Sequence, residues 1–209
     1  TIAMKIGTKK LLVLAGSSVL AFSANTAHAQ SADDSLTVGV DVEVAAAGSV
    51  VSGLKDISIS FDGTGGSGQI YGNEQQFCVF SPTRFFNLTI QGTAKGPTST
   101  SFYVEDAAQS QTTLKFLRYN FQVADIFSGG NNPIGTGAAG LFQNNVAETG
   151  IDGDMFVTDA TCSDGPNLEL KFSIVLTGDA ENDRVVSELV DGQLHSYTDT
   201  VTVILEPAV

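Results

Sequence analysis

Residues 36–44 carry an apolar side chain at every second position. Successive side chains of a β-strand point to opposite faces, so this alternation predicts a strand with one apolar row and one polar face. The apolar row consists of Leu36, Val38, Val40, Val42 and Val44. A row of this length needs a groove to fill, and that groove belongs either to the same molecule or to a neighbouring one.

Short strand patterns separated by turn residues follow along the rest of the chain. The clearest is the alternation over residues 168–176, which is typical of a sandwich strand with one solvated face. With 22 glycines and few charged residues, this succession predicts an all-β sandwich or barrel. The other predicted strands cover residues 57–61, 77–80, 85–90, 101–104, 114–123, 155–157 and 200–205.

The segments between these strands have the composition of loops. Residues 129–140 are rich in glycine and predict a long loop. Within a polar, acidic stretch, residues 183–190 predict either one short helical turn or one arm of a hairpin. The sequence has no internal repeat and no domain linker. We therefore expect a single sandwich domain over residues 49–209, preceded by a strand and a flexible joint over residues 30–48.

The first 29 residues have the three parts of a secretion signal. Three lysines precede an apolar core over residues 11–22, and Ala27-His28-Ala29 fits the small-x-small rule for signal peptidase. Residues 1–3 precede the expected initiator Met4 and carry no fold information. The apolar core is too short for a transmembrane helix, and no second one follows. We expect an exported mature protein of about 180 residues that begins at Gln30.

The chain is acidic, with 23 Asp and Glu residues against 10 Lys and Arg residues. All three charged residues of the signal are lysines, so the mature protein keeps seven basic residues and has a net charge of −16. Nucleic acid would be repelled, and no cluster of Lys and Arg with interleaved aromatic residues offsets the repulsion. We interpret the acidic residues as a solvated outer surface.

Cys78 and Cys162 are the two cysteines of a protein expected in an oxidising compartment, and a disulfide between them is the natural inference. Closing a loop of about 84 residues stabilises a fold by about 4 to 5 kcal/mol in the chain-entropy model. A metal site or a reactive thiol is the weaker alternative. After His28 leaves with the signal, His195 alone could join the two thiols, which is short of the ligand count of a zinc site.

One acidic segment resembles the start of a calcium loop. Asp179-x-Glu181-x-Asp183 has the first ligand positions of an EF-hand. Arg184 stands where the sharp turn needs Gly, and Val190 stands where a bidentate carboxylate is needed. The segment is therefore not an EF-hand.

No other arrangement of residues points to chemistry. The acidic residues Asp152, Asp154 and Asp159 are a weaker calcium hypothesis, set against a plain solvated turn, so no metal ligand is assigned. No Gly-x-Ser-x-Gly elbow is present, and no spacing singles out a glycosidase pair of carboxylates. His195 is interpreted as a turn residue before the last strand. The sequence favours a protein that is not an enzyme and has no cofactor.

The two ends of the chain carry the most specific pattern. The alternating residues 36–44 are followed by Ala45-Ala46-Ala47-Gly48 as a flexible joint. The chain closes with Tyr-x-Asp-Thr-Val-Thr-Val over residues 197–203, followed by Ile204 and Leu205. This combination resembles the subunits of archaic chaperone–usher pili of the Csu type, the spore-coat-U-like pilin family.

The resemblance implies an immunoglobulin-like β-sandwich that is incomplete and is completed by a donor strand from a neighbour. The side chains that would fill the neighbour's groove are Leu36, Val38, Val40, Val42 and Val44. Those of the last strand that would face a chaperone or a neighbour are Val201, Val203 and Leu205. Burying five such donor side chains contributes about 7 to 15 kcal/mol before ordering costs.

The resemblance also implies partners and a location. The partners are identical or related pilin subunits in a head-to-tail polymer, a periplasmic chaperone and an outer-membrane usher. The location is an extracellular fimbria on a Gram-negative bacterium, where it supports surface attachment or biofilm. The alternative hypothesis is a self-contained secreted sandwich that acts as an adhesin or a ligand-binding module.

Overall fold

The computed structural model describes residues 34–44, 48–61, 70–83, 85–111, 115–126, 132–135, 140–152, 161–163, 165–176, 179–188 and 195–208. Strands dominate these ranges, and the predicted all-β class is confirmed. The elements are β1 (Asp34–Val44), β2 (Val50–Ser52), β3 (Ile57–Phe61), β4 (Ile70–Phe80), β5 (Phe85–Gly92), β6 (Phe102–Glu105), β7 (Phe116–Asp125), β8 (Asn132–Pro133), β9 (Ala147–Asp152), β10 (Leu168–Val175), α1 (Ala180–Glu188) and β11 (Ser196–Pro207).

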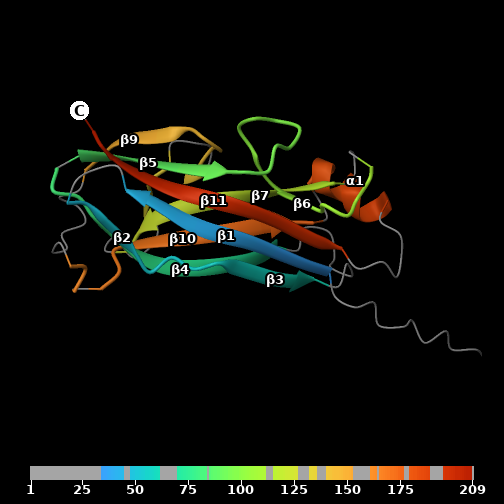
Figure 1. Cartoon of the computed structure of the whole chain (residues 1–209), viewed down its shortest axis with the longest axis horizontal. Coiled ribbons are helices and arrows are strands. Elements are labelled where there is room, and N and C mark those ends of the chain that lie inside the picture. The colour runs from blue at the N-terminus through green and yellow to red at the C-terminus, as the bar shows by residue number, and fades with distance from the viewer. Residues whose placement is uncertain are drawn as a thin grey trace, which may run out of the picture. The chain divides into compact units, whose positions relative to one another are not determined.

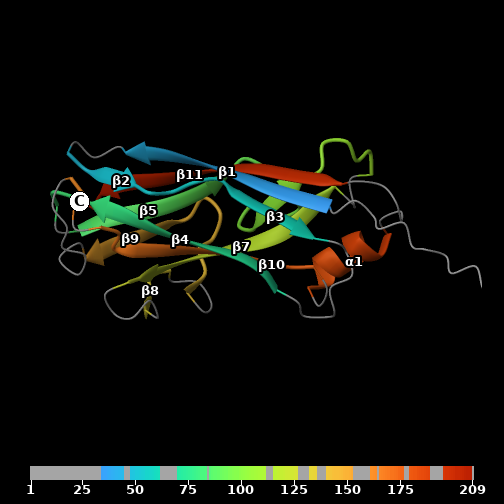
Figure 2. The same cartoon turned by 90° about the horizontal axis from the view of Figure 1, so that it is seen from below.

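The strands follow one hydrogen-bonded path in the order β2-β4-β10-β7-β6-β11-β1-β3. In addition, β5 pairs with β11 and β9, and β8 pairs with β7. The path curls over, so that β4, β10 and β7 form one layer while β1, β11 and β5 form another (Figures 1 and 2). The result is an immunoglobulin-like sandwich whose layers are joined through β6.

Apolar side chains from both layers meet in one core. In β10 the buried side chains are Leu168, Leu170, Phe172 and Ile174, and the residues between them are partly exposed. This is the alternation that the sequence predicts for this strand. The centre of the core is aromatic, because the ring of Phe121 lies 5.3 Å from Phe102, 5.3 Å from Tyr119 and 5.7 Å from Phe172. Each such buried side chain stabilises the fold by about 1.5 to 3 kcal/mol.

Several predicted elements differ in extent from the observed ones. β4 begins at Ile70, seven residues before the predicted strand. Neither β2 nor β9 was expected from the pattern. The expected loop over residues 129–140 contains the two-residue strand β8, whose Pro133 pairs with Ala124 of β7. The strand predicted over residues 155–157 lies outside the described residues.

Helix α1 continues the pairing of two strands where their own ladder stops. The ladder of β10 and β7 ends at Ser173↔Asn120. Beyond it, Asn182 Oδ1 accepts the Arg118 N–H at 2.7 Å, and Asn182 Nδ2 donates to the carbonyls of Arg118 and Val175, both at 2.8 Å. The Asn182 side chain is buried. Its carboxamide therefore takes the place of a strand neighbour and fixes α1 to the sandwich.

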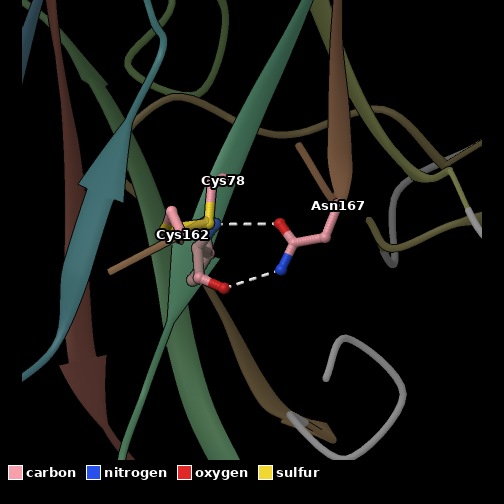
Figure 3. Close-up of a disulfide and its surroundings, with 4 residues drawn as sticks. Cys78, Cys162 and Asn167 are labelled. Atoms are coloured by element: carbon pink, nitrogen blue, oxygen red, sulfur yellow. Dashed lines mark hydrogen bonds between the residues drawn. A yellow bond between two sulfur atoms is a disulfide. The ribbon is translucent and has the colours of Figure 1, made fainter. Parts of the chain in front are cut away.

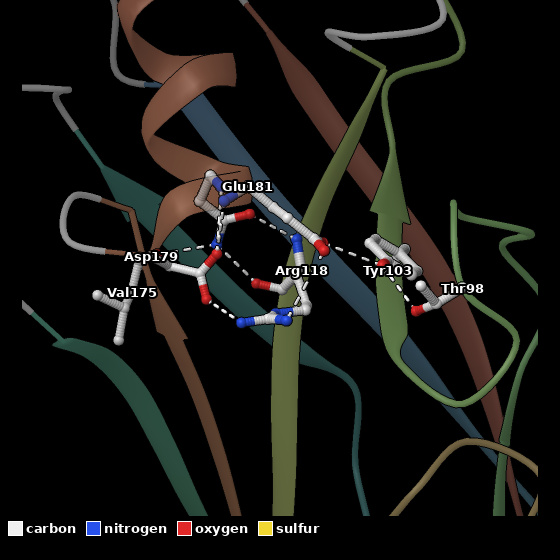
Figure 4. A network of polar contacts seen from close by, with 7 residues as sticks. Thr98, Tyr103, Arg118, Val175, Asp179 and Glu181 are labelled. Atoms are coloured by element: carbon white, nitrogen blue, oxygen red, sulfur yellow. Dashed lines mark hydrogen bonds and ion pairs between the residues drawn. The ribbon is translucent and has the colours of Figure 1, made fainter.

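The start of α1 is held by the acidic residues that resemble an EF-hand. Asp179 Oδ1 accepts the backbone N–H groups of Glu181 at 3.0 Å and Asn182 at 3.3 Å, which is the action of a helix N-cap. The guanidinium of Arg118 pairs with Asp179 and, at 3.8 Å, with Glu181 (Figure 4). Glu181 also accepts the Tyr103 hydroxyl at 3.0 Å. The carboxylates of Asp179 and Glu181 therefore have structural partners.

No helix within the described ranges is long and apolar enough to cross a membrane.

Candidate functional site

Strand β1 lies beside the last strand of its own chain. β1 and β11 run parallel and pair over ten residues, at the centre of the layer that Figure 1 shows in front. The register sets Val40 opposite Val201, Val42 opposite Val203 and Val44 opposite Leu205. The two apolar rows that the sequence singles out at opposite ends of the chain are therefore neighbours in space.

The apolar row of β1 is buried at its start and exposed at its end. Leu36 and Val38 are 0 % exposed and belong to the core, and Val40 is partly buried against it. Val42 is 41 % exposed and Val44 is 37 % exposed. The groove of the chain itself thus accommodates about half of the row.

The other neighbour of β1 covers the same half. β3 pairs antiparallel with residues 34–38 of β1. Just beyond the last pair of this ladder, Val38 and Ile57, the Val40 N–H donates to Asp56 Oδ1 at 3.0 Å. In the described part of the chain, no strand pairs with residues 41–44 on the side opposite β11. This end of β1 therefore has an open backbone edge next to two exposed valines, which is the kind of edge that accepts a further strand.

The expected open groove is filled in the structure. We expected a sandwich over residues 49–209 that lacks a strand, but β1 occupies the place beside β11 and closes the interior of its own domain. The physical reason is proximity: within one chain, closing a loop costs little more as the loop grows, whereas recruiting a neighbour depends on concentration. The use of the same row by a neighbouring subunit stays a prediction.

The last strand is an inner strand, and its apolar row faces the core. Val201, Val203 and Leu205 are at most 2 % exposed. On the side opposite β1, β11 pairs with β5 over residues 201–207 and with β6 at Thr198. In the single chain the predicted neighbour-facing row is therefore covered.

A buried carboxylate ties β11 to the other layer. Asp199 is 7 % exposed, and its Oδ1 accepts the Ala94 N–H at 2.8 Å and the Thr93 N–H and hydroxyl at 3.0 and 2.9 Å. Its Oδ2 accepts the Tyr119 hydroxyl at 2.6 Å. A buried charge is tolerated when hydrogen-bond donors surround it in this way. Asp199 thus fixes β11 against β7 and against the segment that follows β5.

Two buried tyrosines predict a loss of stability in alkali. Burial and the neighbouring Asp199 raise the pKa of Tyr119 well above its ordinary value. Burial, with the charges of Asp106 and Asp34, also raises the pKa of Tyr197. Because the unfolded chain ionises near pH 10 and the folded chain does not, stability should be complete below about pH 10 and fall above it, by about 1.4 kcal/mol per pH unit for each tyrosine.

Denaturant unfolding between pH 8 and pH 11 measures this dependence. Tyr119→Phe should make the fall less steep, because the variant lacks one of the two groups. A free energy of unfolding that stays constant to pH 11 would contradict the raised pKa of the two tyrosines.

His195 lies directly before β11, as the sequence predicts, but its surroundings were not expected. Its ring is buried, and Nδ1 lies 2.9 Å from Asp106 Oδ2. Its backbone N–H donates to Asp34 Oδ1 at 2.9 Å, and its carbonyl accepts the Ser35 N–H at 3.0 Å. His195 therefore contacts the first two residues of β1.

The predicted disulfide between Cys78 and Cys162 is present, with a Cα–Cα distance of 6.0 Å (Figure 3). Next to it, Asn167 Oδ1 accepts the Val79 N–H at 2.8 Å, and Asn167 Nδ2 donates to the Val79 carbonyl at 2.7 Å. The disulfide and this buried amide fasten the segment before β10 to β4. They lie in the opposite layer from β1.

Within the described ranges, no group of three or more His, Cys, Asp or Glu side chains is placed to hold a metal ion. Asp152 ends β9, whereas the other residues of the calcium hypothesis, Asp154 and Asp159, lie outside the described residues.

Comparisons with known proteins leave the family undecided. No protein-family model matches the chain, and no curated protein matches it. A chain from a solved structure described as "Chaperone-tip adhesin complex is vital for synergistic activation of CFA/I fimbriae biogenesis" is similar over 67 % of this chain, with 13 % identity and a TM-score of 0.43. The match spans 35 % of the length of that chain. We therefore infer function from the contacts of β1 and β11.

Proposed function

We propose that the protein is a structural subunit of an extracellular fimbria, in which each subunit passes its β1 to the next one. The observation that carries the proposal is the parallel pairing of β1 with β11 along ten residues at the end of the described chain. A strand of this kind can be exchanged between identical chains, because a neighbour's copy makes the same backbone bonds and fills the same pockets. Passing strands head to tail does not close a ring and produces a fibre.

The burial of β1 supports exchange energetically. The contacts of Leu36 and Val38 are the same for a strand from the same chain and for one from a neighbour. Their contribution to the free energy of exchange is therefore zero. The gain from exchange comes from the partly exposed Val42 and Val44, which a subunit interface can cover. Burying the exposed part of each valine contributes on the order of 1 kcal/mol. The open edge beside residues 41–44 offers further backbone bonds.

The route to the fibre follows from the expected secretion signal and from the resemblance to spore-coat-U-like pilins. The chain is exported to the periplasm, a chaperone covers the place of β1 beside β11 until assembly, and an outer-membrane usher delivers the subunit to the surface. The fibre supports attachment or biofilm. The role is mechanical, with no catalytic residue and no cofactor.

A second candidate function is favoured by the position of β1 in its own domain. A sandwich that closes itself can act alone as a secreted adhesin or ligand-binding module. It would stay monomeric at all concentrations and would need no assembly partner.

One pair of variants separates the two functions. Val42→Asp places a charge on the exposed end of the apolar row, where the monomer tolerates it and a subunit interface does not. Thr37→Asp adds the same charge to the exposed opposite face of the same strand. The purified mature chain is incubated at high concentration, where mass action favours exchange, and polymers are counted by negative-stain microscopy.

We expect fibres from the wild type and from Thr37→Asp and none from Val42→Asp. A wild-type protein that remains monomeric throughout would favour the self-contained module. Fibres from Val42→Asp equal to those of Thr37→Asp would show that the row of β1 is not the interface.

A further inference from the structure

The first residues of β1 and β11 are joined through one residue, His195. Both polar groups of its backbone bind β1: the N–H donates to Asp34 Oδ1 at 2.9 Å, and the carbonyl accepts the Ser35 N–H at 3.0 Å. The hydroxyl oxygens of Ser35 and Ser196 lie 3.4 Å apart beside these bonds. Since the two strands are parallel, they begin at the same end of the layer, and His195 holds both beginnings together.

The side chain of His195 is anchored in turn. The imidazole is 5 % exposed, and Nδ1 lies 2.9 Å from Asp106 Oδ2. The other oxygen of Asp106 accepts the Ala108 N–H at 2.9 Å, and the Asp106 N–H donates to the Lys115 carbonyl at 2.9 Å. The connection from β6 to β7 therefore fixes Asp106, Asp106 fixes the ring, and the ring holds the backbone that binds β1.

The electrostatic surroundings agree with this geometry. Tyr197 follows two residues after His195 and is buried, and its ring lies 6.2 Å from the imidazole. The charges of Asp106 and Asp34, after burial, raise the pKa of the Tyr197 hydroxyl. The carboxylates of Asp34 in β1 and of Asp106 in the connection between β6 and β7 thus both act on the buried Tyr197 hydroxyl.

Among the described residues, none anchors the opposite end of β1 in a comparable way. Val42 and Val44 are partly exposed, and β3 does not extend to them. A strand held in this way opens first at residues 41–44, which in the described part of the chain pair with β11 alone, because the first bonds to break there expose few apolar atoms. The bonds at Asp34 and Ser35 are the last to break before Leu36 and Val38 leave the core.

We propose that His195, positioned by Asp106 and bound by Asp34, is a clamp that retains β1 in its own domain and limits the rate at which β1 passes to a second copy of this chain. The clamp rests on the proposed function in one respect, namely that the released strand is taken up by a neighbour. Retention of β1 by the clamp is a property of the single molecule. The two statements are therefore open to separate tests.

Asp34→Ala tests the clamp, with Asp41→Ala as the matched control. Both variants remove one carboxylate from β1, but Asp34 accepts the His195 N–H whereas Asp41 is exposed on the polar face. Asp34→Asn keeps a carbonyl oxygen that can accept the same bond. Amide hydrogen exchange is measured by mass spectrometry on the mature chain at low concentration, for peptides that cover β1 and, as an internal reference, β10.

We expect exchange in β1 to be about tenfold faster in Asp34→Ala and within about twofold of the wild type in Asp41→Ala and Asp34→Asn. Exchange in β10 should be unchanged in all three variants. A general loss of stability would instead raise the exchange rates of both β1 and β10. Equal exchange of β1 in Asp34→Ala and Asp41→Ala would overturn the clamp.

The rate of polymer formation at high concentration completes the test. If strand passage is the assembly step, Asp34→Ala should also polymerise about tenfold faster than Asp41→Ala. Faster exchange of β1 without polymers from any variant would support the clamp and contradict the fimbrial function. Faster polymerisation without faster exchange of β1 would overturn the clamp and leave the fimbrial function supported.

Discussion

A chain shortened to residues 48–209 is expected to lose its fold and to regain it when a peptide of residues 34–44 is added. Leu36 and Val38 are fully buried, and each contributes about 1.5 to 3 kcal/mol. Removing β1 also exposes the row of β11 and unpairs ten residues of its ladder. These losses are a large part of the 5 to 15 kcal/mol of net stability that a domain has.

Circular dichroism and thermal unfolding measure this effect, with the peptide titrated into the shortened chain. A peptide that carries Leu36→Asp and Val38→Asp is the control, and it should not restore the fold. A shortened chain that unfolds at the same temperature as the mature protein, with no peptide present, would mean that β1 is not part of the sandwich.

Asp199→Ala is expected to lower the free energy of unfolding by about 3 to 5 kcal/mol. The buried carboxylate accepts four hydrogen bonds, and its loss leaves the Tyr119 hydroxyl and the Ala94 N–H without their acceptor. Each buried donor without a partner costs about 1 to 3 kcal/mol. Thr93 is less affected, because its N–H also donates to the Thr200 carbonyl at 3.0 Å.

Denaturant unfolding at pH 7 measures the effect of this substitution. Asp199→Asn keeps one acceptor oxygen and should cost less than Asp199→Ala. Asp41→Ala removes an exposed carboxylate from the adjacent strand and should stay within about 0.5 kcal/mol of the wild type. A change below about 1 kcal/mol for Asp199→Ala would contradict the role given to this carboxylate.

The alternation of apolar and polar residues predicts which face of a strand is buried, but it does not predict which strand pairs with it. In β10 the predicted buried row is observed, because both neighbours of that strand lie in the same layer and one face meets the core. In β1 the alternation identifies Leu36 and Val38 as buried residues, but it contains nothing about which strand lies beside them. The parallel pairing with β11 joins residues about 160 positions apart, and such a contact leaves no trace in a local pattern.

The start of β4 was missed because its inner row is polar. Tyr71, Asn73 and Gln75 lie opposite the buried Ile174, Phe172 and Leu170 of β10, so they share the face that looks inward. Gln75 has a partner that explains its place: its carboxamide exchanges two hydrogen bonds of 2.8 Å with the backbone of Lys55. A strand that uses side chains to bind a neighbouring backbone does not show apolar alternation.

The polar residues of the site follow the alternation of the last strand. His195 and Asp199 stand at the same parity as Tyr197, Val201 and Val203, which is the buried row of β11. A titratable group on a buried row needs a partner, so its presence predicts a hydrogen-bonded polar site. The partners Asp106 and Tyr119 come from other parts of the chain, and the sequence could not have named them.

A covalent lock on β1 tests most directly whether this strand leaves its own domain when subunits join. Gly39 and Thr200 lie opposite each other, and a Cβ added at Gly39 would be 3.4 Å from Thr200 Oγ1, so Gly39→Cys with Thr200→Cys places two thiols within reach of a disulfide. Gly39→Ser with Thr200→Ser is the unlocked control. After oxidation of the monomer at low concentration, we predict fibres from the serine control and none from the locked protein. Fibres from both at equal rates would contradict strand exchange.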